Sequence, residues 1–112
     1  MKAYTDIEQS KKLAEILPIE SANMFYDQYG VIRIGNPKER YSDYHQLPVW
    51  SLAALIDILP DESDIVKGKL DVVDYKYMCT VCIKEEVITV FGNNLLDACY
   101  EMIIKLYKRK LL

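Results

Sequence analysis

The residues between Val73 and Ile83 alternate in character, and this alternation constrains the fold more than any other feature of the chain. Odd positions are apolar or aromatic, and even positions are mostly polar. Because successive side chains of a strand point to opposite faces of a sheet, a period of two predicts a half-buried strand. The run continues as IKEEVITVF, which predicts a hairpin with its turn near Glu85 and Glu86.

The same stretch contains a C-x-x-C motif formed by Cys79 and Cys82. In a strand, residues three apart lie on opposite faces, so Cys79 should face the core and Cys82 the other side. A zinc site needs about four ligands, and neither Cys99 nor His45 stands at a recognisable ligand spacing. A thioredoxin-like motif would open a helix. We therefore expect ordinary strand cysteines, with no metal site and no cofactor, and the reactivity of Cys82 stays open.

The first third of the chain predicts a helix followed by a hairpin. Thr5 with Glu8 three residues later fits a capping box, and Pro18 marks the end of the helix. The stretches Asn23–Tyr26 and Val31–Ile34 are rich in β-forming residues and are separated by a turn that contains glycine. We expect these two stretches to pair.

Two further helices are predicted from caps and apolar spacing. Ser51 is a natural N-cap for the run LAALIDIL, which Pro60 ends. Asn94, with Asp97 three residues later, caps the last helix, whose apolar positions form one face. The acidic start and basic end of that last helix suit the helix dipole.

The elements together predict one α+β domain over residues 1–112, with an antiparallel sheet of hairpins packed against amphipathic helices. Hairpins that do not alternate with helices argue against a parallel, doubly wound sheet. A chain of 112 residues is long enough for one domain and too short for two ordinary ones. The residues expected in or against the core are Trp50, Leu52, Leu55, Ile56, Leu59, Val81, Val90, Leu95, Cys99, Met102, Ile103 and Leu106.

Composition narrows the class of protein. Hydrophobic residues make up 51% and charged residues 28%, which is typical of a globular chain. The net charge of −3 and pI of about 5.1 disfavour a sequence-independent nucleic-acid binder. The N-terminus lacks the apolar segment of a signal peptide, and no window approaches the roughly 20 apolar residues of a membrane span. Three cysteines, an odd number, do not suggest a disulfide framework, so we expect a cytoplasmic protein without a membrane partner.

Catalytic residues are sparse. Asp43 stands two residues before His45, and such a pair can orient a general base. No serine or cysteine in a nucleophile setting accompanies the pair, and a solvated loop histidine explains it as well. The adjacent Glu85 and Glu86 should diverge at a turn. With four glycines in the chain, phosphate-cradling loops are not expected. We predict no enzymatic activity, and an enzyme using Asp43 and His45 is kept as an alternative.

Tyrosines and basic residues gather around the first hairpin and the loop after it. The candidate binding surface comprises Tyr26, Tyr29, Arg33, Lys38, Arg40, Tyr41 and Tyr44. Exposed tyrosine mixed with arginine is typical of recognition surfaces for proteins or single-stranded nucleic acids. The alternative is that the rings are half-buried against the sheet with their hydroxyls in water.

We expect a protein partner, whose identity the sequence does not give. Nucleic acid, bound through Arg33, Lys38, Arg40 and the nearby tyrosines, is the alternative that the acidic pI disfavours. Self-association into a homodimer stays open, because an exposed strand edge or aromatic patch can close a symmetric dimer. Whether residues 36–46 become ordered only on binding is also open.

Three segments carry a resemblance: MKAYTDIEQSKKLAEILPIESANM, PVWSLAALIDILP and NNLLDACYEMIIKLYKRKLL. Together they resemble a family of short, uncharacterised proteins of gut bacteria that is associated with prophages and other mobile elements. The resemblance covers both ends and the central helix, whereas residues 61–92 show no match. It implies a cytoplasmic, prophage-associated accessory protein, and it brings no functional residues with it because the matching segments are helices and caps.

Overall fold

A computed structural model describes residues 2–27, 29–36, 47–60, 63–67 and 77–112. The chain divides into two compact units. One is Ala3–Ala54, and the other combines residues 1–2 with Leu55–Leu112. Each unit is described separately below.

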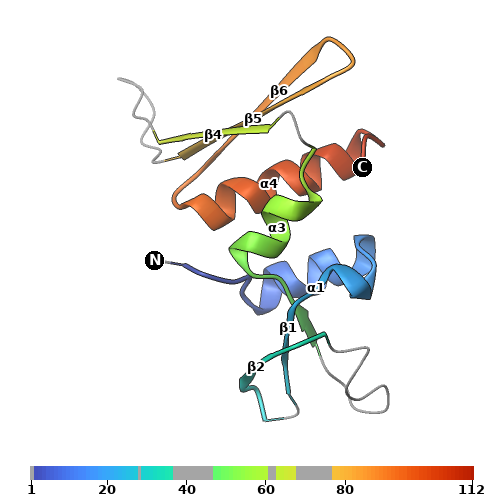
Figure 1. The fold of residues 1–112 in the computed structure, drawn as a ribbon, viewed down its shortest axis with the longest axis vertical. Coiled ribbons are helices and arrows are strands. Elements are labelled where there is room, and N and C mark those ends of the chain that lie inside the picture. Colours follow the sequence, from blue (N-terminus) through green and yellow to red (C-terminus); the bar gives the residue numbers. More distant parts are fainter. Residues whose placement is uncertain (1, 28, 37–46, 61–62, 68–76) are drawn as a thin grey trace. The chain divides into compact units, whose positions relative to one another are not determined.

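The Ala3–Ala54 unit contains a small sheet whose strands lie in the order β2-β1-β3. Both pairings are antiparallel, and Phe25 in the central strand lies opposite Arg33 on one side and Pro48 on the other. The predicted hairpin is therefore confirmed, and it gains a third strand. The elements, followed along the ribbon in Figure 1, are α1 (Ile7–Ile16), a short 3-10 helix (Ile19–Ser21), β1 (Met24–Tyr26), β2 (Ile32–Ile34), β3 (Leu47–Val49) and the beginning of α3 (Leu52–Ile58).

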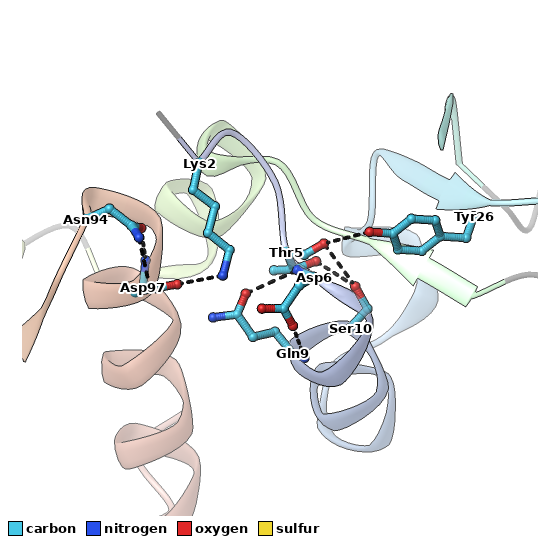
Figure 2. Close-up of polar contacts among 8 residues, drawn as sticks. All are labelled: Lys2, Thr5, Asp6, Gln9, Ser10, Tyr26, Asn94 and Asp97. Carbon is cyan, nitrogen blue, oxygen red and sulfur yellow. Dashed lines mark hydrogen bonds and ion pairs between the residues drawn. The ribbon is translucent and has the colours of Figure 1, made fainter. Parts of the chain in front are cut away.

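Helix α1 is capped by Asp6, so the prediction that Thr5 forms its capping box with Glu8 is wrong. The Asp6 carboxylate accepts from the Gln9 N–H at 2.8 Å, and the Gln9 side chain accepts from the Asp6 N–H at 3.2 Å (Figure 2). A capping box is present, one residue later than predicted.

Thr5 instead belongs to the interior of this unit. Its backbone N–H donates to the Trp50 carbonyl at 3.0 Å, and its hydroxyl accepts from the Trp50 N–H at 3.1 Å. The same hydroxyl is hydrogen-bonded to the buried Ser10 hydroxyl at 2.8 Å (Figure 2). Because these bonds engage the Thr5 side chain, the neighbouring carboxylate is left to cap the helix.

The core of the Ala3–Ala54 unit contains Leu13, Phe25, Val49 and Trp50, all buried. The indole N–H of Trp50 donates to the Ser21 hydroxyl at 2.9 Å, which satisfies the polar atom of the buried ring. In helix α3, the Ser51 hydroxyl accepts from the Ala54 N–H at 3.2 Å, as expected of its N-cap.

The other unit is built around a second antiparallel sheet, in the order β4-β5-β6. In this sheet Cys79 of the central strand lies opposite Ile65 and Val90. Helix α4 contacts strands β5 and β6. The elements, all labelled in Figure 1, are the remainder of α3, β4 (Ser63–Lys67), β5 (Tyr77–Ile83), β6 (Glu86–Gly92) and α4 (Leu95–Lys108).

The turn between β5 and β6 consists of Lys84 and Glu85, one residue earlier than predicted. Both have positive φ angles, 51° and 66°. Two-residue hairpins favour this left-handed geometry because its twist matches that of the strands. Glu86 is consequently the first residue of β6, and its carboxylate is paired with Arg109.

Helix α4 begins as the sequence predicts. The Asn94 side-chain oxygen accepts from the Asp97 N–H at 2.8 Å, and its amide donates to the Asp97 carboxylate at 2.9 Å. The other carboxylate oxygen of Asp97 accepts from the Lys2 ammonium, also at 2.9 Å (Figure 2). Just before the cap, Gly92 approaches the helix so closely that a Cβ there would lie 2.5 Å from the Ala98 backbone nitrogen.

The predicted core is largely confirmed. Eight of the expected residues are buried: Trp50, Leu55, Leu59, Val81, Cys99, Met102, Ile103 and Leu106. Leu52, Val90 and Leu95 are half-buried. Ile56 is exposed, so its assignment to the core is wrong. Leu55 in α3 and Leu59 directly after it define the buried side of this segment, and Ile56 lies about 100° around the helix axis from Leu55, beyond that side.

The α+β class and the antiparallel pairing are confirmed. The two predicted hairpins belong to two different three-stranded sheets in the described part of the chain. The extent of a single domain over residues 1–112 stays a prediction.

Candidate functional site

The tip of the β1–β2 hairpin is fixed by Asp27. One of its carboxylate oxygens accepts from two backbone N–H groups, that of Tyr29 at 2.8 Å and that of Val31 at 3.0 Å. The Asp27 N–H donates to the Val31 carbonyl at 2.9 Å, and the Gly30 N–H donates to the Asp27 carbonyl at 2.9 Å. Gly30 supplies the positive φ of 76° that the turn needs.

The second carboxylate oxygen of Asp27 is 2.9 Å from Nε of Arg33, on the returning strand. The Val31 N–H holds the pKa of Asp27 below its ordinary value, and the Arg33 side chain and the Tyr29 N–H lower it further. Partial loss of solvation raises this pKa and offsets only part of the effect. Hydrogen bonds to the ionised form favour that form, so Asp27 is a carboxylate at neutral pH. One side chain thus ties together the turn and the start of β2.

Large apolar side chains are exposed on this fixed hairpin. Tyr29 is 78% exposed and Ile34 is 79% exposed, and Val31 between them is 48% exposed. Arg33 is exposed as well. We call Tyr29, Val31, Arg33 and Ile34 the hairpin surface. Single exposed apolar residues are ordinary on a protein surface, whereas large contiguous apolar patches are commoner at interaction sites. Because successive residues of a strand point to opposite faces, Arg33 and Ile34 lie on opposite faces of β2.

Two of the predicted surface residues, Tyr29 and Arg33, lie on the hairpin surface. Tyr26 is half-buried, and its hydroxyl donates to the Thr5 carbonyl at 3.5 Å (Figure 2). This ring therefore has a structural contact of its own within the Ala3–Ala54 unit. The others lie outside the described residues: Lys38, Arg40, Tyr41 and Tyr44. The alternative catalytic pair, Asp43 and His45, also lies outside them.

Sequence reasoning missed Asp27, Val31 and Ile34. A signal for Asp27 was present, because an aspartate at the start of a four-residue turn that contains glycine often accepts from backbone N–H groups two or more residues later. The exposure of Ile34 carried no such local signal.

The cysteines lie as the alternation predicts. Cys79 is buried and Cys82 is exposed, and both belong to the regular strand β5. Burial raises the pKa of the Cys79 thiol to about 11. Burial, with the Cys79 thiol as a second cause, raises the pKa of Cys99 to about 12. Both buried thiols are protonated at neutral pH and behave as small apolar groups.

Among the residues with described positions, no cluster of three or more His, Cys, Asp or Glu side chains is arranged to hold a metal ion. Within the same part of the chain, no helix has the length and apolar character needed to cross a bilayer. Comparison of the chain with protein-family models, curated proteins and solved structures gave no match.

Proposed function

We propose that this protein is a small, non-enzymatic accessory protein that binds a protein partner through the hairpin surface. The observation that carries the proposal is the exposure of Tyr29 and Ile34, 78% and 79%, on a hairpin that Asp27 holds in one conformation. Binding energy at protein interfaces is concentrated in a few buried anchors, and tyrosine is among the commonest of them.

The fixed turn favours binding because it lowers the entropic cost of association. A tyrosine has only two side-chain torsions to immobilise, and the hairpin tip that carries Tyr29 is already tied to Asp27 by four hydrogen bonds and one ion pair. Strand β2 is only three residues long, so the partner should gain more from side-chain contacts than from added backbone pairing. A partner with an apolar pocket for a tyrosine ring fits this surface.

Arg33 argues for a protein rather than a nucleic acid. Its Nε is engaged by a carboxylate of the same hairpin, which weakens its attraction for phosphate. Nucleic-acid binding and an enzyme using Asp43 and His45 stay alternatives. Lys38 and Arg40, which the first would use, and Asp43 and His45, which the second would use, fall outside the described part of the chain. The cytoplasmic, prophage-associated setting is likewise part of the proposal.

The test is affinity capture of the tagged protein from its native host, with nuclease treatment, followed by mass spectrometry and by titration with the purified partner. We expect Tyr29→Ser to weaken the partner's affinity by about tenfold or more. Tyr107→Ser is the matched control, because Tyr107 is also exposed but lies on α4. The control should bind as the unaltered protein does.

Equal binding by the unaltered protein and Tyr29→Ser would refute the assignment to the hairpin surface. Co-purification that disappears on nuclease treatment, with an affinity that falls steeply as salt rises, would replace the proposal with nucleic-acid binding.

A further inference from the structure

Basic side chains gather at one end of the Leu55–Leu112 unit. Helix α4 ends there, and Arg109, directly after the helix, is paired with Glu86 at the start of β6. Because Glu86 follows the turn between β5 and β6, this ion pair brings that turn to the end of the helix. We call the exposed lysines of the turn and of the helix end the basic end: Lys84, Lys105, Lys108 and Lys110.

The charge of the basic end is opposite to that of the rest of the chain. Residues 84–86 and 101–110 contain five basic and three acidic side chains, a net charge of +2, whereas the other residues contain nine basic and fourteen acidic ones, a net charge of −5. Within the described part of the chain, none of the four lysines is paired with an acidic side chain. An acidic protein can therefore attract a polyanion at this end alone.

Two of the four lysines have a backbone conformation that lysine disfavours. Lys84 and Lys110 have positive φ angles, 51° and 58°. Lys110 closes α4, because its N–H donates to the Tyr107 carbonyl at 3.0 Å. The next N–H, that of Leu111, donates to the Leu106 carbonyl at 2.9 Å. Glycine is the commonest residue at the position that Lys110 occupies, so the lysine is present there in spite of a strained backbone.

The lysines are not needed to complete the helix. The last four carbonyls of a helix have no partner within it, and lysine side chains can donate to them. Here the backbone N–H groups of Arg109, Lys110 and Leu111 donate to three of the last four carbonyls of α4. The helix dipole favours positive charge at this end, but it does not explain Lys84, which lies in the turn of the hairpin.

We propose that the basic end binds a single-stranded nucleic acid, with the lysines on phosphates and the Tyr107 ring against a base. Tyr107 is 46% exposed and directly precedes Lys108. Lysine suits any polyanion, whereas an exposed aromatic ring beside it favours a polyanion whose bases are unstacked. The binding is independent of sequence, because an ammonium group on a phosphate reads no base.

The affinity should depend steeply on salt. Each phosphate neutralised on a single strand contributes about 0.7 to the slope of log affinity against log salt concentration, so four lysines give a slope of about −3 at most. This surface is separate from the hairpin surface, which belongs to the Ala3–Ala54 unit. The inference does not rest on the proposed protein partner.

Fluorescence anisotropy with a labelled oligothymidine of about 12 nucleotides tests the proposal. The main variant combines Lys84→Asn with Lys110→Gly, which removes two lysines and gives both positions a residue that tolerates a positive φ. We expect binding at low salt to weaken about tenfold or more and the salt slope to become shallower by about 1.4. Because the Tm should stay the same or rise, unfolding cannot account for the loss.

The matched control combines Lys11→Gln with Lys12→Gln. These two lysines are exposed on α1, and the control changes the net charge by the same amount. It should bind the oligonucleotide with the affinity and salt slope of the unaltered protein. Equal weakening in the control and the main variant, or no binding to the oligonucleotide at low salt, would overturn the proposal.

Substitutions of Tyr107 test the contact with a base. Tyr107→Ser should weaken binding about fivefold or more without changing the salt slope, whereas Tyr107→Phe should keep the affinity. Tyr29→Ser should leave oligonucleotide binding unchanged, which separates this surface from the hairpin surface. Equally tight binding to duplex DNA, or binding to vesicles of phosphatidylserine and phosphatidylcholine but not to the oligonucleotide, would refute the assignment to a single strand.

Discussion

The turn between β5 and β6 should be stabilised by replacing Lys84 with Asn and Glu85 with Gly. Both native residues have a left-handed backbone, with φ of 51° and 66°, and both are exposed. Asn-Gly is the preferred pair for a two-residue turn of this type. The double change removes one positive and one negative charge, so the net charge of −3 is kept.

The expected gain follows from the backbone of the two positions. A left-handed conformation costs an ordinary residue about 1–2 kcal/mol. Glycine removes that cost at position 85 but gives back about 0.5–1 kcal/mol in chain entropy. Asparagine tolerates the conformation better than lysine at position 84. The two changes together should raise the free energy of unfolding by about 1–2 kcal/mol, which corresponds to a Tm about 4–8 °C higher.

Thermal and urea unfolding followed by circular dichroism measure this gain. Glu85→Ala is the control, because it shortens the side chain but keeps a Cβ at a φ of 66°, so it should not stabilise. If the double variant keeps its secondary structure and unfolds at the same or a lower temperature, the strain argument is wrong.

Four further predictions concern other positions. Gly92→Ala should lower the free energy of unfolding by about 1–3 kcal/mol, because its Cβ would lie 2.5 Å from backbone of α4. A Cβ at Gly30 would meet open space, so Gly30→Ala should lower the free energy of unfolding only by the cost of a left-handed backbone, about 1 kcal/mol. A loss in urea unfolding that is larger than the loss in Gly92→Ala would contradict this. The urea midpoint should fall as pH rises from 9.0 toward about 11, because the thiols of the unfolded chain ionise over this range while the buried thiols of Cys79 and Cys99 stay protonated in the folded protein. Cys99→Ala removes one of these thiols and should reduce the fall. Because the pKa of Asp27 is lowered, the stability that its carboxylate gives the hairpin is present at neutral pH and is lost as pH falls below about 4. Hydrogen-exchange protection of the hairpin should therefore drop below that pH. Asp27→Asn should show the same drop at neutral pH.

Local features of the fold could be predicted from the sequence, and long-range ones could not. The Asn94 cap was predicted because capping depends on residues three apart. The cap of α1 was misplaced by one residue, because Thr5 and Asp6 are both good N-caps. What decides between them is the pairing of Thr5 with Trp50, 45 positions away. No local pattern contains that information.

In the candidate site, too, local features could be predicted from the sequence and long-range ones could not. Exposure of Tyr29 could be expected from its place in a turn. Exposure of Ile34 could not, because two paired strands do not show which of them will receive a third. Here β3 pairs with β1, which leaves β2 at the edge with Ile34 on it. The opposite faces predicted for Cys79 and Cys82 were correct, because alternation within one regular strand is a local property.

The ion pair between Lys2 and Asp97 bears on how the chain folds during synthesis. Residues 3–54 form one unit from a continuous segment, whereas the other unit combines Lys2 with residues 55–112, and the ion pair joins Lys2 to a residue translated 95 positions later. The ribosome therefore releases the whole of the first unit while the second has only its first two residues. We expect chains arrested after β3 has emerged to show protease protection of α1 and β1, as domains fold in the order of their synthesis. Protection that appears only once α4 is complete would mean that the first unit does not fold by itself.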